Sequence, residues 1–545
     1  MADVADIGSS RDEFKGVDGL YDYVIVGGGS AGCVLAARLS EDPDVKVCLL
    51  EAGPADTSPN IHVPAGGAKL FRTQVDWDYD SHGEPYCADR RIYLPRGRVL
   101  GGTSSMNGMI YVRGNRLDYD SWGQPGWSYD ELLPYFVRAE DNERGASGYH
   151  GSGGPLAVSE NRSRNPMSDA FIAAAIEAGY SANDDFNGPD QDGFGYFQVT
   201  QRNGMRCSSA AAYLHPAAER PNLTIETGVQ VHRVVMEDGR ATGVAGQRAD
   251  GEFTIRAERE VILAAGAYNS PQLLMLSGIG PADLLTALGI PVVADQPQVG
   301  QNLQDHPQFW LVYGHSQPVS LLAAGEERHQ RQFAEQQSGP LTSNGPEAGG
   351  FIRSRHDLPT PDLQFVSLPV MFADGGLGFP NQHAISFGAF VLQPRSRGSV
   401  TLAGDDPTAK PRITHNYYAD DADLEAAVVG VRVALSIARR SALGPFTERP
   451  LSVPASESDA DIRDFLRRNT QTSYHAAGSC AMGLVTDSEL RVLGAEGLRI
   501  VDASVMPTLV SGNTNAPTIA IAEKAADLIR GMAPLPRAAA AAARG

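Results

Sequence analysis

A short glycine-rich turn between a buried strand and a helix limits most strongly what this chain can fold into. The segment YDYVIVGGGSAGCVLAARLSEDPDVKVCLLEAG, Tyr21 to Gly53, follows the order strand, turn, helix, strand. Its first apolar run is typical of a strand that is buried on both faces. Such a β-α-β unit occupies about 30 residues, so we expect a parallel α/β sheet at this end of the chain.

The glycines of this turn have the spacing of a dinucleotide-binding loop. Gly27 permits the tight turn, Gly29 lets the backbone approach a pyrophosphate, and Gly32 lets the helix pack closely on the strand. The helix N-terminus carries about half a positive charge, which favours phosphate. Glu51 ends the second strand, 19 residues beyond Gly32, where a carboxylate accepts hydrogen bonds from ribose hydroxyls. The motif predicts a dinucleotide and disfavours NADP, but it does not separate FAD from NAD.

Length and composition indicate a large globular chain with two or more domains. The 545 residues are 42% hydrophobic and 20% charged, which is enough apolar material for more than one core. A net charge of −20 disfavours nucleic acid or an anionic membrane as a partner. The five cysteines contain no CxxC pair, which favours a reducing compartment. With no signal-peptide pattern and no apolar run of membrane-spanning length, we expect a cytoplasmic protein.

Four further stretches occur in an order that resembles one enzyme family. They are RGRVLGGTSSMNGMIYVRGNRLDYDSW from Arg96, GAYNSPQLLMLSGIG from Gly266, VGQNLQDHP from Val299, and HAAGSCAMG from His475 with the later LRIVDASVMPTLVSGNTNAPTIAIAEKAADLI. Together with the glycine loop they resemble the glucose–methanol–choline (GMC) oxidoreductases, flavoproteins that oxidise alcohols. The resemblance extends from Tyr21 to Met532 and is nearest to the choline dehydrogenase-like and the aryl-alcohol or hydroxymethylfurfural oxidase-like branches.

The resemblance implies an α/β fold of the type shared with p-hydroxybenzoate hydroxylase. A Rossmann-type FAD-binding domain is joined to a second, α+β substrate domain with a mainly antiparallel sheet. We expect a discontinuous FAD-binding domain from residues 18–160, 222–310 and 465–532. We expect the substrate-binding domain from residues 161–221 and 311–464, and a disordered tail at 533–545.

The resemblance also implies FAD as the cofactor. The family wraps the flavin with the segment that here runs from Val99 to Ile110, and its glycines let the backbone approach a flat ring. Some members attach FAD covalently through a histidine after the paired serines, but Met106 stands there in this chain, so we expect non-covalent FAD. The implied cofactor-binding residues are Gly27, Gly29, Ser30, Ala31, Gly32, Glu51, Ala52, Val99, Gly102, Asn107, Gly108, Met109, Ile110, Val231, Asp502 and Ala503.

His475 needs a choice between three roles, because a lone histidine is more often structural than catalytic. Zinc binding with Cys480 is disfavoured, since the other cysteines lie far away in sequence, and we predict no metal site. Alcohol oxidation needs a base, and histidine is about three-quarters neutral at pH 7. It also needs a group that orients the alcohol oxygen, which asparagine does without titrating. The family pattern assigns these catalytic roles to His475 and Asn513, with Asn515 as the neighbouring alternative. We interpret His306, in the stretch LQDHP, as a structural residue.

These residues predict FAD-dependent oxidation of a primary alcohol to an aldehyde. His475 takes the hydroxyl proton while hydride passes to flavin N5, and O2 or another acceptor reoxidises the flavin. Two alternatives stay open: a FAD-containing hydroxynitrile lyase-like enzyme and a flavin-binding protein without catalysis. Tyr474 is a candidate substrate residue, and with Trp77, Tyr79 and Phe365 it is predicted to form an aromatic pocket for an aryl alcohol or a quaternary ammonium. The sequence specifies neither the alcohol nor the oligomeric state.

Overall fold

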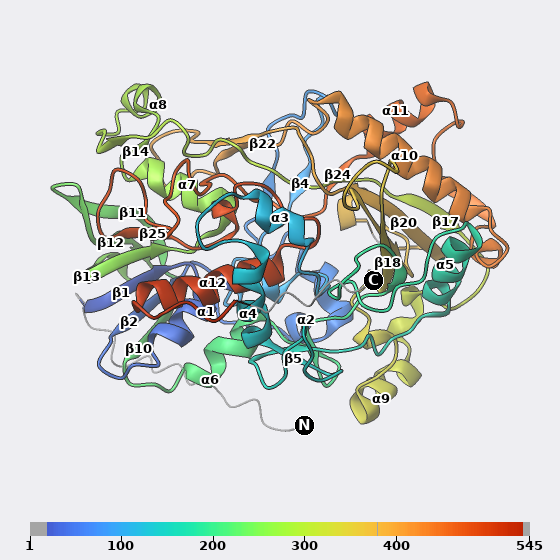
Figure 1. Ribbon diagram of the computed structural model, residues 1–545, viewed down its shortest axis with the longest axis horizontal. Coiled ribbons are helices and arrows are strands. Elements are labelled where there is room, and N and C mark those ends of the chain that lie inside the picture. Colours follow the sequence, from blue (N-terminus) through green and yellow to red (C-terminus); the bar gives the residue numbers. More distant parts are fainter. Residues whose placement is uncertain (1–18, 379, 538–545) are drawn as a thin grey trace.

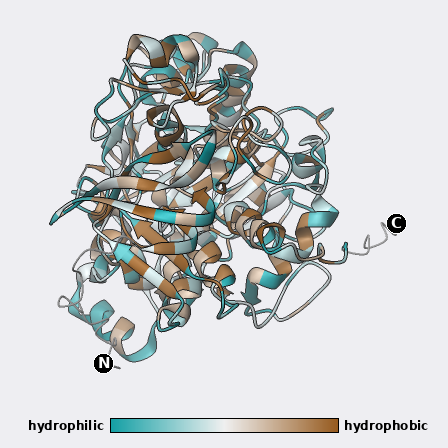
Figure 2. Ribbon diagram, turned by 90° about the vertical axis from the view of Figure 1, so that its left-hand side faces the viewer, coloured by the Kyte–Doolittle hydropathy of each residue, from teal (hydrophilic) through white to brown (hydrophobic). Residues whose placement is uncertain are grey.

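Two β-sheets, each built from segments far apart in the chain, organise the structure (Figure 1). It is a computed structural model, and it describes residues 19–378 and 380–537. One sheet lies on the left of Figure 1 and the other on the right, and several segments pass between them. Hydrophobic residues concentrate in the interior strands and helices, while the outer loops are mostly hydrophilic (Figure 2).

The first sheet confirms the predicted β-α-β unit. Strand β1 (Leu20–Val26) pairs in parallel with β2 (Val47–Glu51), and α1 (Ser30–Leu39) connects them. The sheet order is β10-β2-β1-β13-β12-β11, and β25 pairs with β13. Strands β10, β2, β1, β13 and β25 run parallel, whereas β11, β12 and β13 form antiparallel neighbours. The added strands are β10 (Leu223–Thr227), β11 (Gln230–Glu237), β12 (Arg240–Arg248), β13 (Gly251–Leu263) and β25 (Leu498–Ile500).

The second sheet is antiparallel throughout, as predicted for this fold class. Its order is β23-β17-β20-β19-β18-β7, with β16 and β24 paired beside β20. Helix α10 (Asp421–Ala438) packs on β20 and α5 (Pro166–Glu177) packs on β18. The strands are β7 (Gly193–Tyr196), β16 (Pro307–Gln308), β17 (Leu311–Gly314), β18 (Ala348–Ile352), β19 (Leu363–Leu368), β20 (Ala384–Val391), β23 (Arg449–Ser452) and β24 (Gln471–Thr472).

The strands of the first sheet come from the segments that we predict for the FAD-binding domain. The second sheet draws mainly on the segments predicted for the substrate-binding domain, but β16 and β24 lie just beyond those boundaries. The division into domains stays a prediction. In the predicted tail, the N–H of Leu535 donates to the hydroxyl of Tyr135 at 3.3 Å. Residues 538–545 of that tail, and residue 18, lie outside the described residues.

The remaining elements connect or cover the two sheets. Within residues 19–378 and 380–537, no helix combines the length and the apolar character that crossing a bilayer would require. The other helices are α2 (Pro59–His62), α3 (Arg116–Ser121), α4 (Tyr129–Ala139), α6 (His215–Ala217), α7 (Gly266–Leu276), α8 (Ala282–Ala287), α9 (Glu327–Gln336), α11 (Asp459–Asn469) and α12 (Asn515–Ile529). The short strands are β3 (Tyr79–Asp80), β4 (Tyr93–Leu94), β5 (Glu140–Asn142), β6 (Leu156–Val158), β8 (Gln201–Arg202), β9 (Met205–Arg206), β14 (Ile279–Gly280), β15 (Ala294–Asp295), β21 (Ser399–Thr401) and β22 (Arg412–Thr414).

Candidate active site

A cavity of about 1180 Å³ is lined by residues of both sheets. Small-molecule pockets usually measure about 300–1,000 Å³, so this cavity has room for a large cofactor together with a substrate. Every residue predicted to bind the cofactor lines it except Gly32 and Val99. Val99 instead packs in a small apolar cluster with Met106 and Leu70.

The glycine loop offers the space and the free donors that a diphosphate needs. Helix α1 begins after Gly29 with no side-chain cap and no acidic residue in its first turn, and Ser30 and Ala31 of that turn line the cavity. The first N–H groups of a helix have no partner within the helix, so they suit an anion. A Cβ added at Gly29 would meet no atom closer than 3.8 Å. At Gly27 it would lie 2.6 Å from the carbonyl oxygen of Ala264, and at Gly32 1.9 Å from that of Gly27. Packing therefore requires Gly27 and Gly32, while Gly29 leaves the approach to the helix open.

Two backbone N–H groups hold Glu51 at the cavity wall beside the glycine loop. Its Oε2 accepts the N–H of Gly28 at 2.9 Å, and its Oε1 accepts the N–H of Gly53 at 2.8 Å. Burial raises the pKa of Glu51 to about 7. A carboxylate has about four lone-pair sites, so two of them stay available for hydroxyl donors. Glu51 and the glycine loop thus fit the adenosine end of FAD.

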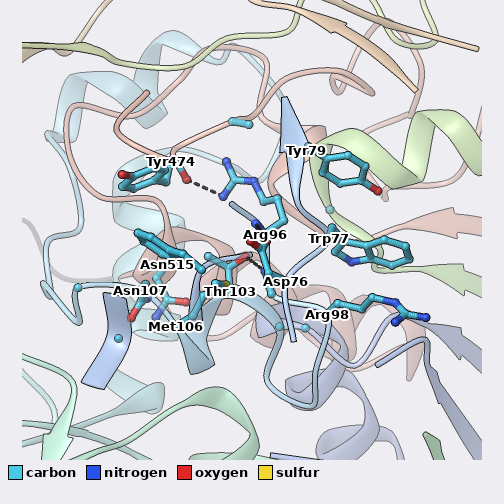
Figure 3. Close-up of a pocket in the computed structure, with 18 of the residues that line it drawn as sticks. Asp76, Trp77, Tyr79, Arg96, Arg98, Thr103, Met106, Asn107, Tyr474 and Asn515 are labelled. Carbon is cyan, nitrogen blue, oxygen red and sulfur yellow. Dashed lines mark hydrogen bonds between the residues drawn. The ribbon is translucent and has the colours of Figure 1, made fainter. Parts of the chain in front are cut away.

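The predicted flavin segment, of which Figure 3 labels Thr103, Met106 and Asn107, is also tightly constrained. The Oδ1 atom of Asn107 accepts the N–H of Met109 at 3.0 Å and Nη1 of Arg206 at 2.9 Å. Met109 has a φ of +53°, and a Cβ added at Gly108 would lie 3.2 Å from Pro346. Burial lowers the pKa of Arg206 to about 9. This close packing holds the backbone of the segment at the cavity wall, as a flat ring against it would require.

The predicted aromatic pocket is only partly correct: Trp77, Tyr79 and Tyr474 line the cavity, but Phe365 does not. Trp77 and Tyr79 stack with ring centroids 5.9 Å apart, and Figure 3 shows Arg96 between them and Tyr474. The carbonyl oxygen of Tyr474 accepts Nη1 of Arg96 at 2.7 Å. Phe365 is fully buried on the other face of β19 and does not line the cavity. Alternate residues of a strand point to opposite faces, so an aromatic residue type alone did not reveal its direction.

His475 and Asn513 lie in contact at the cavity wall. Nε2 of His475 is 3.0 Å from Nδ2 of Asn513. Nε2 of Gln364, on β19, donates to Oδ1 of Asn513 at 3.0 Å, so the amide of Asn513 turns its N–H toward the imidazole. Asn515 takes a different position, because its Oδ1 accepts the hydroxyl of Ser30 in the glycine loop at 2.9 Å. The geometry therefore pairs Asn513, and not Asn515, with His475.

The contacts at Nδ1 of His475 determine the tautomer of its imidazole. Nδ1 of His475 is 3.0 Å from Oγ of Ser473 and 2.9 Å from Nδ1 of His306. The hydroxyl of Ser473 donates to the carbonyl oxygen of His306 at 2.9 Å, so its oxygen is left to accept. His475 consequently carries its proton on Nδ1, and the lone pair on Nε2 faces Asn513 and the cavity.

Burial keeps this histidine pair neutral. Burial, and then the neighbouring His306, hold the pKa of His475 well below its usual range. Burial also lowers the pKa of His306 to about 4. His306 thus contacts His475 directly, although the sequence indicated only a structural role for it.

Asp305 fixes the backbone beneath both imidazoles. Its Oδ1 accepts the N–H of His475 at 2.8 Å and the N–H of His306 at 3.0 Å. Its Oδ2 accepts the hydroxyls of Thr472 and Tyr417. Asp305, Ser473 and Gln364 were not predicted as site residues from the sequence. The motif VGQNLQDHP was a signal for Asp305, whereas nothing in the apolar strand around Gln364 marked that residue.

Comparison with known proteins identifies the family of this chain. Two family models described as GMC oxidoreductase match residues 21–308 and 394–522. The chain belongs to the GMC oxidoreductases. An oxygen-dependent choline dehydrogenase of Paraburkholderia phymatum is 44% identical over 538 residues, which cover 95% of this chain and 94% of that protein. An alcohol dehydrogenase (acceptor) of Pseudomonas putida is 41% identical over 94% of this chain and 96% of its own length.

Solved structures agree with the family. Pyridoxine 4-oxidase from Mesorbium loti superimposes with a TM-score of 0.86 at 33% identity, over 94% of this chain and all of that one. The GMC protein is thus a FAD-dependent enzyme that oxidises alcohols at CH–OH groups, and the predictions of fold, cofactor and enzyme class are confirmed. These findings favour neither the lyase nor the non-catalytic alternative.

Proposed function

We propose that this GMC enzyme oxidises a primary alcohol to an aldehyde, with His475 as the base and Asn513 as the orienting group. The 3.0 Å separation of Nε2 of His475 and Nδ2 of Asn513 carries the proposal. An alcohol hydroxyl that takes the place of the Asn513 N–H at Nε2 donates its proton to the lone pair of His475. Its oxygen accepts the N–H of Asn513, so the two side chains fix both the position and the direction of the alcohol. We assign Tyr474, whose φ is +69°, to the substrate wall.

We further propose that FAD is held without a covalent bond, since Met106 offers no nitrogen for attachment. When bound, FAD supplies the hydride acceptor at N5. The residues that hold it in this proposal are Gly27, Gly29, Ser30, Ala31, Gly32, Glu51, Ala52, Val99, Gly102, Asn107, Gly108, Met109, Ile110, Val231, Asp502 and Ala503.

The low pKa of His475 determines when the proton moves. At neutral pH the free imidazole is in the basic form, so every enzyme molecule is ready to accept a proton. It is too weak a base to leave a standing alkoxide, so the proton passes to Nε2 as the hydride departs. The carboxylate of Asp305, held against the backbone of His475, then stabilises the positive imidazolium. Positioned bases contribute about 100- to 10,000-fold to such rates.

The second half-reaction requires an electron acceptor. We propose O2 or another acceptor, because the relatives include both an oxygen-dependent choline dehydrogenase and an alcohol dehydrogenase (acceptor). An imidazolium beside the flavin favours transfer to O2 by stabilising the negative charge that develops.

The five free cysteines support the expected cytoplasmic location.

Anaerobic titration with a panel of primary alcohols tests the proposal, with the visible absorbance of the bound flavin as the signal. We expect one class of alcohol to bleach the flavin in the wild type and not in His475→Ala with equal flavin content. Admitting air then distinguishes an oxidase, which regains its colour, from a dehydrogenase. Bleaching that persists at the wild-type rate in His475→Ala would remove His475 from the mechanism.

A further inference from the structure

The wall of the cavity next to His475 and Asn513 is apolar. On β19, Val366 and Leu368 share a face with Gln364, which holds Asn513, because alternate residues of a strand point the same way. Phe390, on β20, places its ring 5.8 Å from that of His475. The apolar side chains that line this end are Trp310, Val366, Leu368, Met371, Phe372 and Phe390, and they form one packed cluster.

The described lining residues place no free carboxylate at this end. The acidic residues of the lining are Glu51, Asp76 and Asp502. Glu51 and Asp502 lie at the glycine loop and the start of α7, where Asp502 accepts the N–H of Gly266 at 2.9 Å.

Asp76 lies nearer to Tyr474, but its carboxylate is already saturated. Its Oδ1 accepts the N–H groups of Asp78 and Arg96, each at 3.0 Å. Its Oδ2 accepts the N–H of Arg72 and the hydroxyl of Tyr93. Four donors leave no lone pair of Asp76 to face a bound cation.

The carboxylate of Asp305 lies behind the backbone of His475, does not line the cavity and already accepts four hydrogen bonds. The lining residue Arg96, whose Nη1 donates to the carbonyl oxygen of Tyr474 at 2.7 Å, places a positive charge beside this end. A second positive side chain, the exposed Lys69, lines the cavity from the 3₁₀ helix η1 (Pro64–Leu70), which packs on η5 (Pro340–Thr342) beside Leu341 of the lining. His475 is neutral, and Asn513 and Ser473 carry no charge. The acidic charge of the chain as a whole does not help, because charges beyond about 8 Å are screened at physiological salt.

A quaternary ammonium would therefore lose its hydration without gaining a counter-charge. The effective cost of burying an ion is several kcal/mol, whereas one cation–π contact returns about 0.5–2 kcal/mol. Trp310 and Phe372 also pack on each other, with centroids 4.9 Å apart and planes tilted by 34°, so they do not form an open aromatic box. The cost of desolvating the ammonium therefore exceeds the cation–π attraction that this wall provides.

We infer that the substrate is an uncharged primary alcohol with an apolar body, and that choline is a poor substrate. The inference rests on the proposed function, since it concerns the alcohol bound at His475 and Asn513. It separates this chain from its relatives named choline dehydrogenase, despite an identity of 44% to one of them.

A matched pair of alcohols tests the inference on the holoenzyme. Choline and 3,3-dimethylbutan-1-ol have nearly the same shape, but only choline is charged. We expect anaerobic flavin reduction to have an apparent second-order rate constant about 100-fold higher for the uncharged isostere, given the cost of burying an unpaired ion. Octan-1-ol and benzyl alcohol extend the uncharged set to longer and flatter bodies.

A charge reversal at the mouth adds a second readout. Lys69→Glu is expected to raise the rate constant for choline by about 3- to 10-fold at low salt, and to leave the isostere unchanged. Lys46→Glu makes the same change of charge on the exposed turn before β2 and should alter neither rate. If Lys69→Glu raised both rates equally, charge at this end would not be the cause.

The outcomes separate this inference from the proposed function. Bleaching by uncharged alcohols that exceeds bleaching by choline, and that is lost in His475→Ala, supports both. Faster bleaching by choline than by its isostere overturns the substrate class and leaves alcohol oxidation at His475 intact. A flavin that neither choline nor any uncharged alcohol bleaches contradicts both.

Discussion

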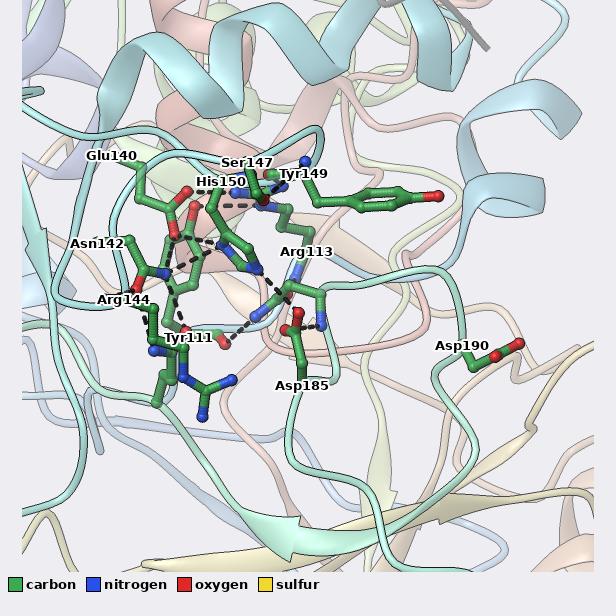
Figure 4. A network of polar contacts seen from close by, with 12 residues as sticks. Tyr111, Arg113, Glu140, Asn142, Arg144, Ser147, Tyr149, His150, Asp185 and Asp190 are labelled. Carbon is green, nitrogen blue, oxygen red and sulfur yellow. Dashed lines mark hydrogen bonds and ion pairs between the residues drawn. The ribbon is translucent and has the colours of Figure 1, made fainter. Parts of the chain in front are cut away.

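Two buried histidines in this molecule are held in opposite states of protonation. His475 and His150 are 8% and 5% exposed, so burial alone does not distinguish them. Nδ1 of His150 lies 3.1 Å from Oε1 of Glu140, and its Nε2 lies 2.9 Å from Oδ2 of Asp185 (Figure 4). Burial lowers the pKa of His150, but the bonds to Asp185 and Glu140 outweigh it and raise the pKa to about 9. His475, which has no carboxylate at its ring, stays neutral.

The surroundings of the two imidazoles explain the difference. Around His150, Arg113 pairs with Glu140 at 2.6 Å with both side chains almost fully buried, and Asn142 bonds to the same carboxylate at 2.8 Å. Every charge in this cluster has a partner, so it joins the end of α4 to the loop that carries Asp185. The ring of His475 meets an amide, a hydroxyl and a second neutral imidazole instead. His150 therefore stabilises the fold, whereas His475 can receive a proton.

Replacing each histidine by glutamine should give the largest difference between the two sites in the rate of flavin reduction. We expect His475→Gln to slow anaerobic flavin reduction by about 100- to 10,000-fold, because the base is lost. His150→Gln should leave the rate per bound flavin unchanged, since His150 lies in the ion-paired cluster and not in the cavity lining. Stopped-flow absorbance on preparations matched for flavin content measures both. Equal losses in the two variants would contradict the division of roles.

Stability should show the reverse pattern. Removing one member of a buried ion pair costs about 3–5 kcal/mol, so His150→Gln should lower the free energy of unfolding by about 3 kcal/mol. Because the folded pKa of about 9 lies above the unfolded value, the contribution of His150 is complete below about pH 6.5 and is lost as pH rises through 9. Denaturant unfolding from pH 6 to 10 measures this. A wild-type slope that persists in His150→Gln would assign the effect to another group.

Asn513 and Asn515 sharpen the comparison within the cavity. Asn513→Ala removes the donor to His475 and to the proposed alcohol oxygen, so flavin reduction should slow by about 10- to 100-fold. Asn515→Ala instead removes the acceptor of Ser30 and should weaken flavin retention at nearly the same rate per bound flavin. Slower reduction in Asn515→Ala alone would exchange the two assignments.

Substitutions of Gln364 should have the smallest effect on the rate of flavin reduction. Gln364→Leu removes one hydrogen bond that orients Asn513, a loss of about 0.5–1.5 kcal/mol, which corresponds to about 2- to 10-fold in rate. Gln364→Glu keeps an acceptor but not the donor, and should be no better than the leucine variant. Wild-type rates in both variants would show that Asn513 is oriented without Gln364.

Features formed by residues close together in the sequence could be predicted, whereas contacts between distant segments could not. The strands and glycines of the β1-α1-β2 unit are contiguous, and so its fold and cofactor loop were predictable. His475 and Asn513 lie only 38 residues apart, in stretches with recognisable patterns. His306 is separated from His475 by 169 residues and Gln364 from Asn513 by 149, so these contacts depend on how the second sheet packs.

The direction in which a side chain points was harder to predict than the type of residue at the site. Phe365 has the residue type expected of an aryl-binding wall, yet it lies between Gln364 and Val366 and faces the core on the other side of β19. The different protonation states of His150 and His475 were equally hidden, because each is set by partners from other segments.

The pH dependence of anaerobic flavin reduction, measured at low concentrations of an alcohol that the enzyme accepts, tests most directly whether His475 is a neutral base. Such rates report the pKa of the free enzyme. Because burial holds the pKa of His475 well below the ordinary value of about 6.5, we predict a constant rate as pH falls from 8 through 6.5, and a decline only further below. In His475→Gln the slow residual rate should show no such decline. A wild-type inflection at or above pH 6.5, or the same acid limb in His475→Gln, would contradict the account.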